Sequence, residues 1–96
     1  MPSYLVETYL ARNLAGERAS RERRARSAAQ QMAGKHGAVR FERSIHIPED
    51  ELCFFVFEAP TSRHVALVAE RAGLDPLRVV EAISSDGRLI DQQEES

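Results

Sequence analysis

The stretch from residue 53 to residue 73 constrains the fold of this chain more than any other part of the sequence. Its sequence is CFFVFEAPTSRHVALVAERAG. The aromatic and β-branched start favours a buried strand, because such side chains pack well on a pleated surface. Pro60 ends the strand, and Thr61 or Ser62 can cap the first free N–H groups of a helix. Apolar residues at helical spacing follow, and Gly73 supplies a left-handed stop.

The size and composition of the chain indicate one small soluble domain. It has 96 residues, of which 43% are hydrophobic and 29% charged, as in ordinary globular proteins. No apolar run approaches the ~20 residues that span a bilayer, and the N-terminus lacks the features of a signal peptide. A single cysteine cannot form an internal disulfide. We therefore expect a cytoplasmic protein without a membrane partner.

The remaining segments complete a β-α-β-β-α-β order. Strands are predicted at 4–9, 40–47, 52–58 and 79–83, and helices at 17–33 and 62–72. This order is the split βαβ, or ferredoxin-like, arrangement of the α+β class. Right-handed crossovers place both helices on one face of a four-stranded antiparallel sheet, with the first and third strands at its centre. We expect residues 1–84 to form the domain and residues 85–96 to be a flexible C-terminal tail.

The other face of this sheet is predicted to be uncovered. In so small a chain, an uncovered apolar face usually marks an interaction surface. We therefore expect a homodimer.

Four segments carry a resemblance to a known family. They are YLVE at 4–7, CFFVFEAP at 53–60, ERAGL at 70–74 and RVVEAI at 78–83. Together they resemble a family of small bacterial ferredoxin-like proteins catalogued as a domain of unknown function, with members described as nickel-binding. The resemblance covers roughly residues 3–84. It implies a dimeric ferredoxin-like domain and, for some members, a bound divalent metal such as nickel. Metal-binding relatives are expected to carry histidines near the first strand, where this chain has Thr8 and Tyr9.

Glutamates that interrupt apolar strands are the first candidate ligand-binding site. Alternation puts Glu7 and Tyr9 on one face of the first strand. If the first and last strands are neighbours, Glu7 and Glu81 can lie side by side, which suits acid–base chemistry or a hard metal ion. Glu58 belongs to the same face if Phe54 and Val56 do. The alternative is that these glutamates pair with arginines or reach water at the sheet edges. The site over the open face would be lined by Glu7, Tyr9, Glu58 and Glu81, with walls at Leu5, Phe41, Phe54 and Val56.

His46 and Cys53 are a second candidate. A turn centred on residues 49–50 pairs them across two strands, with Cβ atoms about 4.5–5.5 Å apart, which is close enough to hold one soft metal ion. Zinc normally takes three or four protein ligands, and no further Cys or His lies nearby in the sequence. The alternative is a cysteine that packs as a small hydrophobe beside a histidine with satisfied hydrogen bonds. A nucleophilic Cys–His pair is a third interpretation.

Five arginines spread around the predicted helix at 17–33. Such a helix can contact phosphates or an acidic partner, and the alternative is a solvated helix face. The strand at 52–58 lacks the glycines and basic residues of ferredoxin-like RNA-binding domains, and the net charge is −2. Nucleic acid is therefore not expected as a partner. The arginines are Arg18, Arg21, Arg23, Arg24 and Arg26.

Three functions stay open at this point. The first is a small dimeric protein that binds a divalent metal ion or a small ligand over the open sheet face. The second is an enzyme of the α+β barrel type, such as a cyclase, isomerase or monooxygenase, that uses Glu and Tyr as acid–base groups; this rests on analogy of fold alone. The third is an interaction module built on the arginine-rich helix.

Overall fold

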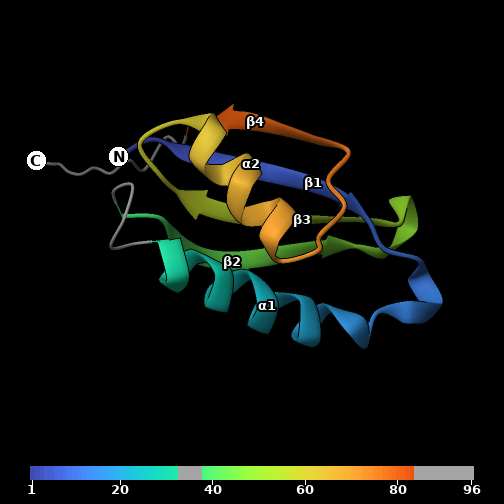
Figure 1. The fold of residues 1–96 in the computed structure, drawn as a ribbon. Coiled ribbons are helices and arrows are strands. Elements are labelled where there is room, and N and C mark those ends of the chain that lie inside the picture. Colours follow the sequence, from blue (N-terminus) through green and yellow to red (C-terminus); the bar gives the residue numbers. More distant parts are fainter. Residues whose placement is uncertain (33–37, 84–96) are drawn as a thin grey trace, which may run out of the picture.

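Helices and strands follow the predicted β-α-β-β-α-β order in the computed structural model, which describes residues 1–32 and 38–83 (Figure 1). The short 3-10 helices η1 (Arg12–Leu14) and η2 (Pro48–Asp50) lie in two of the connections. The predicted tail at 85–96 lies outside the described residues. The strands are β1 (Ser3–Tyr9), β2 (Arg40–Ile47), β3 (Leu52–Glu58) and β4 (Arg78–Ala82), and the helices are α1 (Glu17–Met32) and α2 (Ser62–Arg71).

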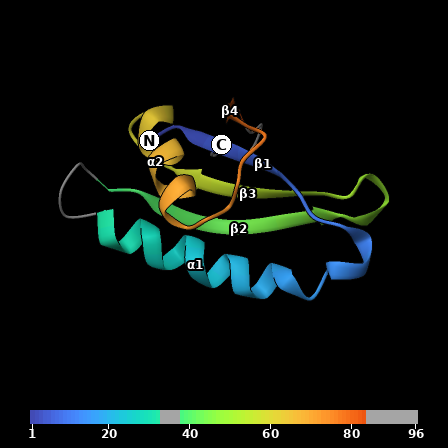
Figure 2. The ribbon, with the colours of Figure 1, turned by 45° about the vertical axis from the view of Figure 1, so that its right-hand side comes forward.

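The four strands form one antiparallel sheet in the order β2-β3-β1-β4. Both helices lie on the same side of it, as two views of the ribbon agree (Figures 1 and 2). Helix α2 packs against β1 and β4, whereas α1 packs against β2 and against α2. This arrangement confirms the ferredoxin-like α+β fold, with β1 and β3 at the centre of the sheet.

Local capping explains why α2 begins and ends where it does. The Thr61 hydroxyl accepts a hydrogen bond from the His64 backbone N–H at 3.3 Å, so Thr61 is the N-cap. At the other end, Gly73 has φ +69° and donates to the Glu70 carbonyl, while Leu74 donates to the Ala69 carbonyl. This pair of bonds is a Schellman motif, which needs a residue that tolerates the left-handed conformation. The predicted cap and glycine stop are both confirmed.

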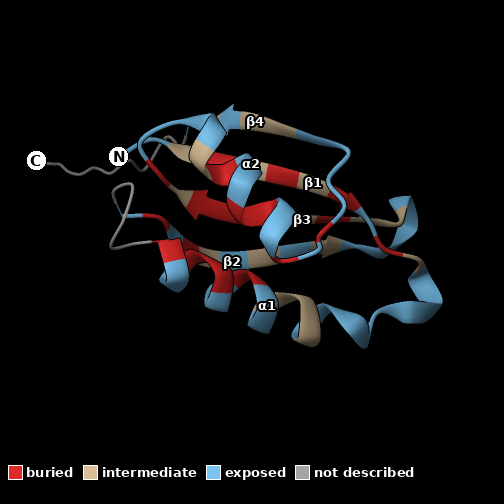
Figure 3. Ribbon diagram, viewed as in Figure 1, coloured by how far each residue is buried: buried red, intermediate tan, exposed pale blue. Residues whose placement is uncertain are grey.

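The core lies between the sheet and the two helices (Figure 3). Phe55 and Phe57 of β3 are fully buried there, as is Val6 of β1. The inner face of α1 is made of small residues, mainly alanine, which lets this helix lie close to the sheet. The largest fully buried side chains are Phe55, Phe57, Leu10, Val6, Val65 and Val68.

A bulge in β2 decides which of its side chains face the helices. The register of β2 against β3 shifts between Phe41 and Arg43. Strict alternation would put Phe41 on the same face as Ile45, but the extra residue reverses the alternation. Phe41 therefore packs inside, with its ring 5.4 Å from that of Phe57. The prediction that Phe41 forms a wall of the open face is wrong for this reason.

Candidate functional site

The sheet face opposite the helices carries a continuous apolar centre, which we call the open-face patch. The strand registers pair Leu5 with both Val56 and Val80, and Phe54 with Ile45. Residues directly opposite each other share a face, so all four strands contribute to the patch. The side chain of Ile45 is 42% exposed there. The open-face patch consists of Leu5, Ile45, Phe54, Val56 and Val80, of which Val56 is already buried in the single chain and the others are partly exposed.

Glu7 lies beside the open-face patch but not beside Glu81. Its partner on β4 is Arg78, whose Nε donates to Glu7 Oε1 at 2.6 Å. The Leu77 backbone N–H donates to the Glu7 carbonyl at 2.7 Å, which fixes this register at the start of β4. Glu81 opposes Tyr4 instead and so points to the face that the helices occupy. The predicted juxtaposition of Glu7 and Glu81 is wrong, because the register of β4 places Arg78 next to Glu7.

Glu58 belongs to a small charged cluster at the end of the patch where β1 begins. It accepts a hydrogen bond from Arg40 at 2.6 Å and shares another with Glu42. Partial burial and then the hydrogen bond to Glu58 raise the pKa of Glu42. The hydrogen bond from Glu42 and the contact with Arg40 lower the pKa of Glu58. The pKa values of the two carboxyl groups are therefore pushed apart, so Glu42 keeps its proton to a higher pH than Glu58 does.

Glu42 was not found from the sequence. It sits at the bulge of β2, where alternation no longer predicts the direction of a side chain. A bulge has no simple signature in a sequence such as RFERSIHI, so only the register revealed this neighbour of Glu58.

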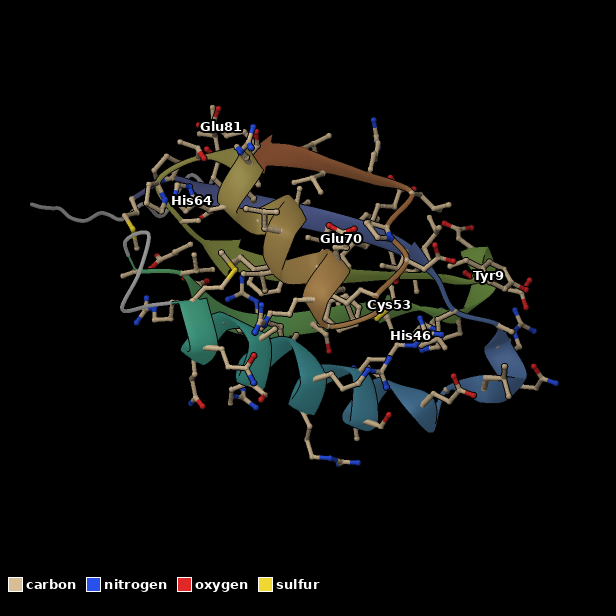
Figure 4. All side chains as sticks on the ribbon, viewed as in Figure 1. Tyr9, His46, Cys53, His64, Glu70 and Glu81 are labelled. Carbon is tan, nitrogen blue, oxygen red and sulfur yellow. The ribbon has the colours of Figure 1, made fainter. Side chains whose placement is uncertain are left out.

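Tyr9 marks the opposite end of the open face. Its hydroxyl donates to Glu51 Oε1 at 3.3 Å, and the Arg12 backbone N–H donates to the other carboxylate oxygen. The negative charge of Glu51 is the main reason why the pKa of Tyr9 is raised. Figure 4 shows Tyr9 at this end and Glu81 at the other end of the sheet. Glu7, Tyr9 and Glu58 thus share the open face, and Glu81 does not.

His46 and Cys53 oppose each other across β2 and β3, as predicted, but they face the helices (Figure 4). Cys53 is fully buried, and this burial raises the pKa of its thiol. His46 is half-buried, with Nε2 3.4 Å from the Leu10 carbonyl. A protonated thiol beneath α1 is a poor nucleophile, so the pair fits packing better than catalysis.

The described residues of one chain do not fit a nickel site. Among residues 1–32 and 38–83, no three His, Cys, Asp or Glu side chains are grouped so as to hold a metal ion. Thr8 of β1 is fully buried and donates to the Cys53 carbonyl at 2.7 Å. A first-row metal ion needs several N, O or S ligands converging on one point.

Comparisons with known proteins support the fold and go no further. No family model matches this chain, and no curated protein does. The structure is similar to the crystal structure of SCO4226 from Streptomyces coelicolor A3(2), with a TM-score of 0.65 at 19% identity. The match covers 86% of this chain and 98% of that one. At this identity the likeness shows a shared fold alone. Within the described ranges, neither helix is long and apolar enough to cross a membrane.

Proposed function

We propose that this protein is a homodimer that binds a small molecule between the open faces of its two sheets. The observation that carries the proposal is the open-face patch itself, which presents apolar side chains from all four strands on the side without helices. Contiguous apolar surface on a small domain usually marks a site of association. A second copy of the same chain can cover this face, because a twofold axis places the same surface of two copies against each other.

The charges around the patch support pairing of two identical copies. Glu7 and Arg78 lie on one side of it, and Arg40 with Glu58 lies at one end. Each copy therefore offers both a positive and a negative group. When a twofold axis relates the two faces, positive side chains of one copy can lie opposite negative side chains of the other. Such pairs favour one relative orientation of the two copies.

The residues of the open-face patch and of its margin also suggest the chemistry of the ligand. Leu5, Phe54 and Val80 offer an apolar surface, while Tyr9 and the Glu7–Arg78 pair offer a few polar groups. Mainly apolar pockets with a few converging polar groups are the usual design of small-molecule sites. We therefore propose a largely apolar ligand with one polar end. We place this binding protein in the cytoplasm, because its buried Cys53 thiol has no internal disulfide partner.

Native mass spectrometry of untagged protein tests the ligand. We expect a dimer that carries a co-purified small molecule. Glu7→Gln should weaken the retention of that molecule, because it removes the charge paired with Arg78. Glu81→Gln is the matched control, since Glu81 is an exposed glutamate on the other face of the sheet. A dimer without any bound molecule would contradict the ligand proposal, as would equal loss in both variants.

An enzyme is the second candidate, and the Glu42–Glu58 pair is the observation that favours it. One carboxyl group with a raised pKa beside one with a lowered pKa is how acid–base catalysts divide their roles. For any small substrate that the protein turns over, this candidate predicts a bell-shaped dependence of the rate on pH. The acidic limb should disappear in Glu58→Gln. A rate that is unchanged in Glu58→Gln would exclude this role for the pair.

A further inference from the structure

A groove between α1 and the end of α2 lies on the helical side, away from the open sheet face. Its volume is ≈ 400 Å³, within the range of small-ligand sites. Ser20, Arg24, Ser27 and Gln31 recur along one side of α1 at intervals of three and four residues, so they line the same helix face. The lining that matters for binding is Ser20, Arg23, Arg24, Ser27 and Gln31 of α1 and Arg71 of α2.

The charged side chains that line this groove are all positive. Three guanidinium groups line it, and none of its lining residues is an aspartate or glutamate. The two glutamates of α1 are engaged elsewhere, since Glu17 pairs with Arg21 and Glu22 accepts a hydrogen bond from Ser44. Among the described residues, the Arg23 side chain has no ion-pair or hydrogen-bond partner. The positive charge of the groove is therefore not neutralised within the described part of the chain.

Two of the arginines are held in place before any ligand arrives. Arg24 donates from Nε to the Ala72 carbonyl at 2.9 Å and from Nη1 to the Ser20 hydroxyl at 3.1 Å. Arg71 reaches across from α2 and donates from Nε to Gln31 Oε1 at 2.7 Å. Because only some of their N–H groups are used in these bonds, the two guanidinium groups keep donors for an anion. Guanidinium groups that are fixed in this way lose little entropy when they bind a phosphate.

We propose that this groove binds a small molecule that carries a phosphate group. Guanidinium forks match the geometry of phosphate oxygens, and the serine hydroxyls can donate to the remaining oxygens. The volume of the groove suits a phosphorylated metabolite. A nucleic acid fits less well, because the chain has a net charge of −2 and β3 lacks the glycine and basic residues of an RNA-reading strand. The groove lies on the helical side of the sheet, opposite the face that we propose for the dimer, so this proposal does not depend on the proposed function.

A titration with inorganic pyrophosphate, followed by NMR at constant ionic strength, tests this proposal on the full chain. We expect saturable shifts of backbone signals in α1 and at the end of α2. Arg23→Gln and Arg71→Gln should each weaken binding roughly tenfold, since each removes charge-assisted hydrogen bonds. Arg24 is left intact, because its bond to the Ala72 carbonyl also satisfies the end of α2.

Matched controls distinguish specific binding in the groove from non-specific electrostatic attraction of pyrophosphate to arginine side chains. Arg12→Gln combined with Arg63→Gln removes two charges outside the groove, and it should leave pyrophosphate affinity almost unchanged. Equal weakening by this control, or shifts that never saturate, would overturn the proposal. A single-stranded DNA oligomer provides the last comparison. If it binds at α1 and pyrophosphate does not displace it, the groove is a nucleic-acid contact and the proposed ligand class is wrong.

Discussion

Replacing Ile45 by lysine should dissociate the proposed dimer without unfolding the domain. Ile45 lies in the open-face patch and keeps 42% of its surface exposed in the single chain, so the chain folds without burying this residue completely. Arg43 lies on the same face of β2 as Ile45. The residue of β3 that opposes Ile45 is Phe54, which is not a carboxylate. The carboxylate in this row of the sheet is Glu7, which lies two strands away beyond Phe54 and is already paired with Arg78, so no carboxylate lies directly opposite the new ammonium group.

The expected magnitude follows from the exposed fraction. Full burial of an isoleucine contributes about 1.5–3 kcal/mol, so burying the remaining 42% contributes about 0.6–1.3 kcal/mol per copy. A twofold interface counts this contribution twice. Each buried ammonium group adds a desolvation cost of several kcal/mol unless its flexible stem carries it back to water. A total loss above about 3 kcal/mol raises the dissociation constant more than about 100-fold.

Sedimentation equilibrium over a range of concentrations measures this change. The wild-type protein should give a mass of twice 10.8 kDa, and Ile45→Lys should give the mass of one chain. Leu67→Lys is the matched control, because Leu67 is also 42% exposed but lies on α2, on the other side of the sheet. Circular dichroism checks that both variants fold. A wild-type monomer, or a dimer that only Leu67→Lys disrupts, would refute the assignment of the interface to the open face.

Three further predictions concern the site residues and the helix cap. The Cys53 thiol should resist a thiol reagent such as DTNB in the native protein at pH 8, because it is fully buried and its pKa is raised. It should react once guanidinium unfolds the protein. Fast labelling of the native protein would contradict this prediction and show that β3 opens. Because the pKa of Glu42 is raised in the folded protein, the fold favours the protonated form of this carboxyl group. Its contribution to the free energy of unfolding is fully present below the unfolded-state pKa and is lost as the pH rises through the folded-state pKa. Urea unfolding should therefore show Glu42→Gln gaining stability relative to wild type between pH 4 and pH 7, and a difference independent of pH would contradict the raised value. Thr61→Ala should cost about 1 kcal/mol in the same assay because the His64 N–H loses its side-chain acceptor, whereas Thr61→Ser should cost much less.

Local sequence was sufficient to predict most of the fold, because the interactions that decide helices and strands act over a few residues. The N-cap at Thr61 and the glycine stop at Gly73 are contacts within one helical turn, and both are present. The opposition of His46 and Cys53 was also predictable, since a short turn fixes the pairing of the strands it joins. The 3-10 helix η1 was not predicted, and Arg12–Leu14 carries no pattern that distinguishes it from a loop.

The candidate site was predicted less completely, because it depends on pairings between distant strands. Glu7 and Glu81 are 74 positions apart, and the backbone bond from Leu77 to Glu7 decides that Arg78 is the neighbour of Glu7. A shift of one residue in a strand moves each side chain to the other face of the sheet. Alternation within β4 could not reveal where that strand starts relative to β1.

The sequence by itself determined the class of fold, the order of the elements and the presence of an uncovered sheet face. These follow from periodicity, caps and the handedness of crossovers, which are properties of short segments. The tertiary structure alone decided which polar side chains meet, namely Glu7 with Arg78, Glu58 with Glu42 and Arg40, and Arg71 with Gln31. The physical reason is that strand register, the bulge in β2 and the packing of α1 on α2 come from the best fit of the whole core, and that fit is not encoded in any one segment.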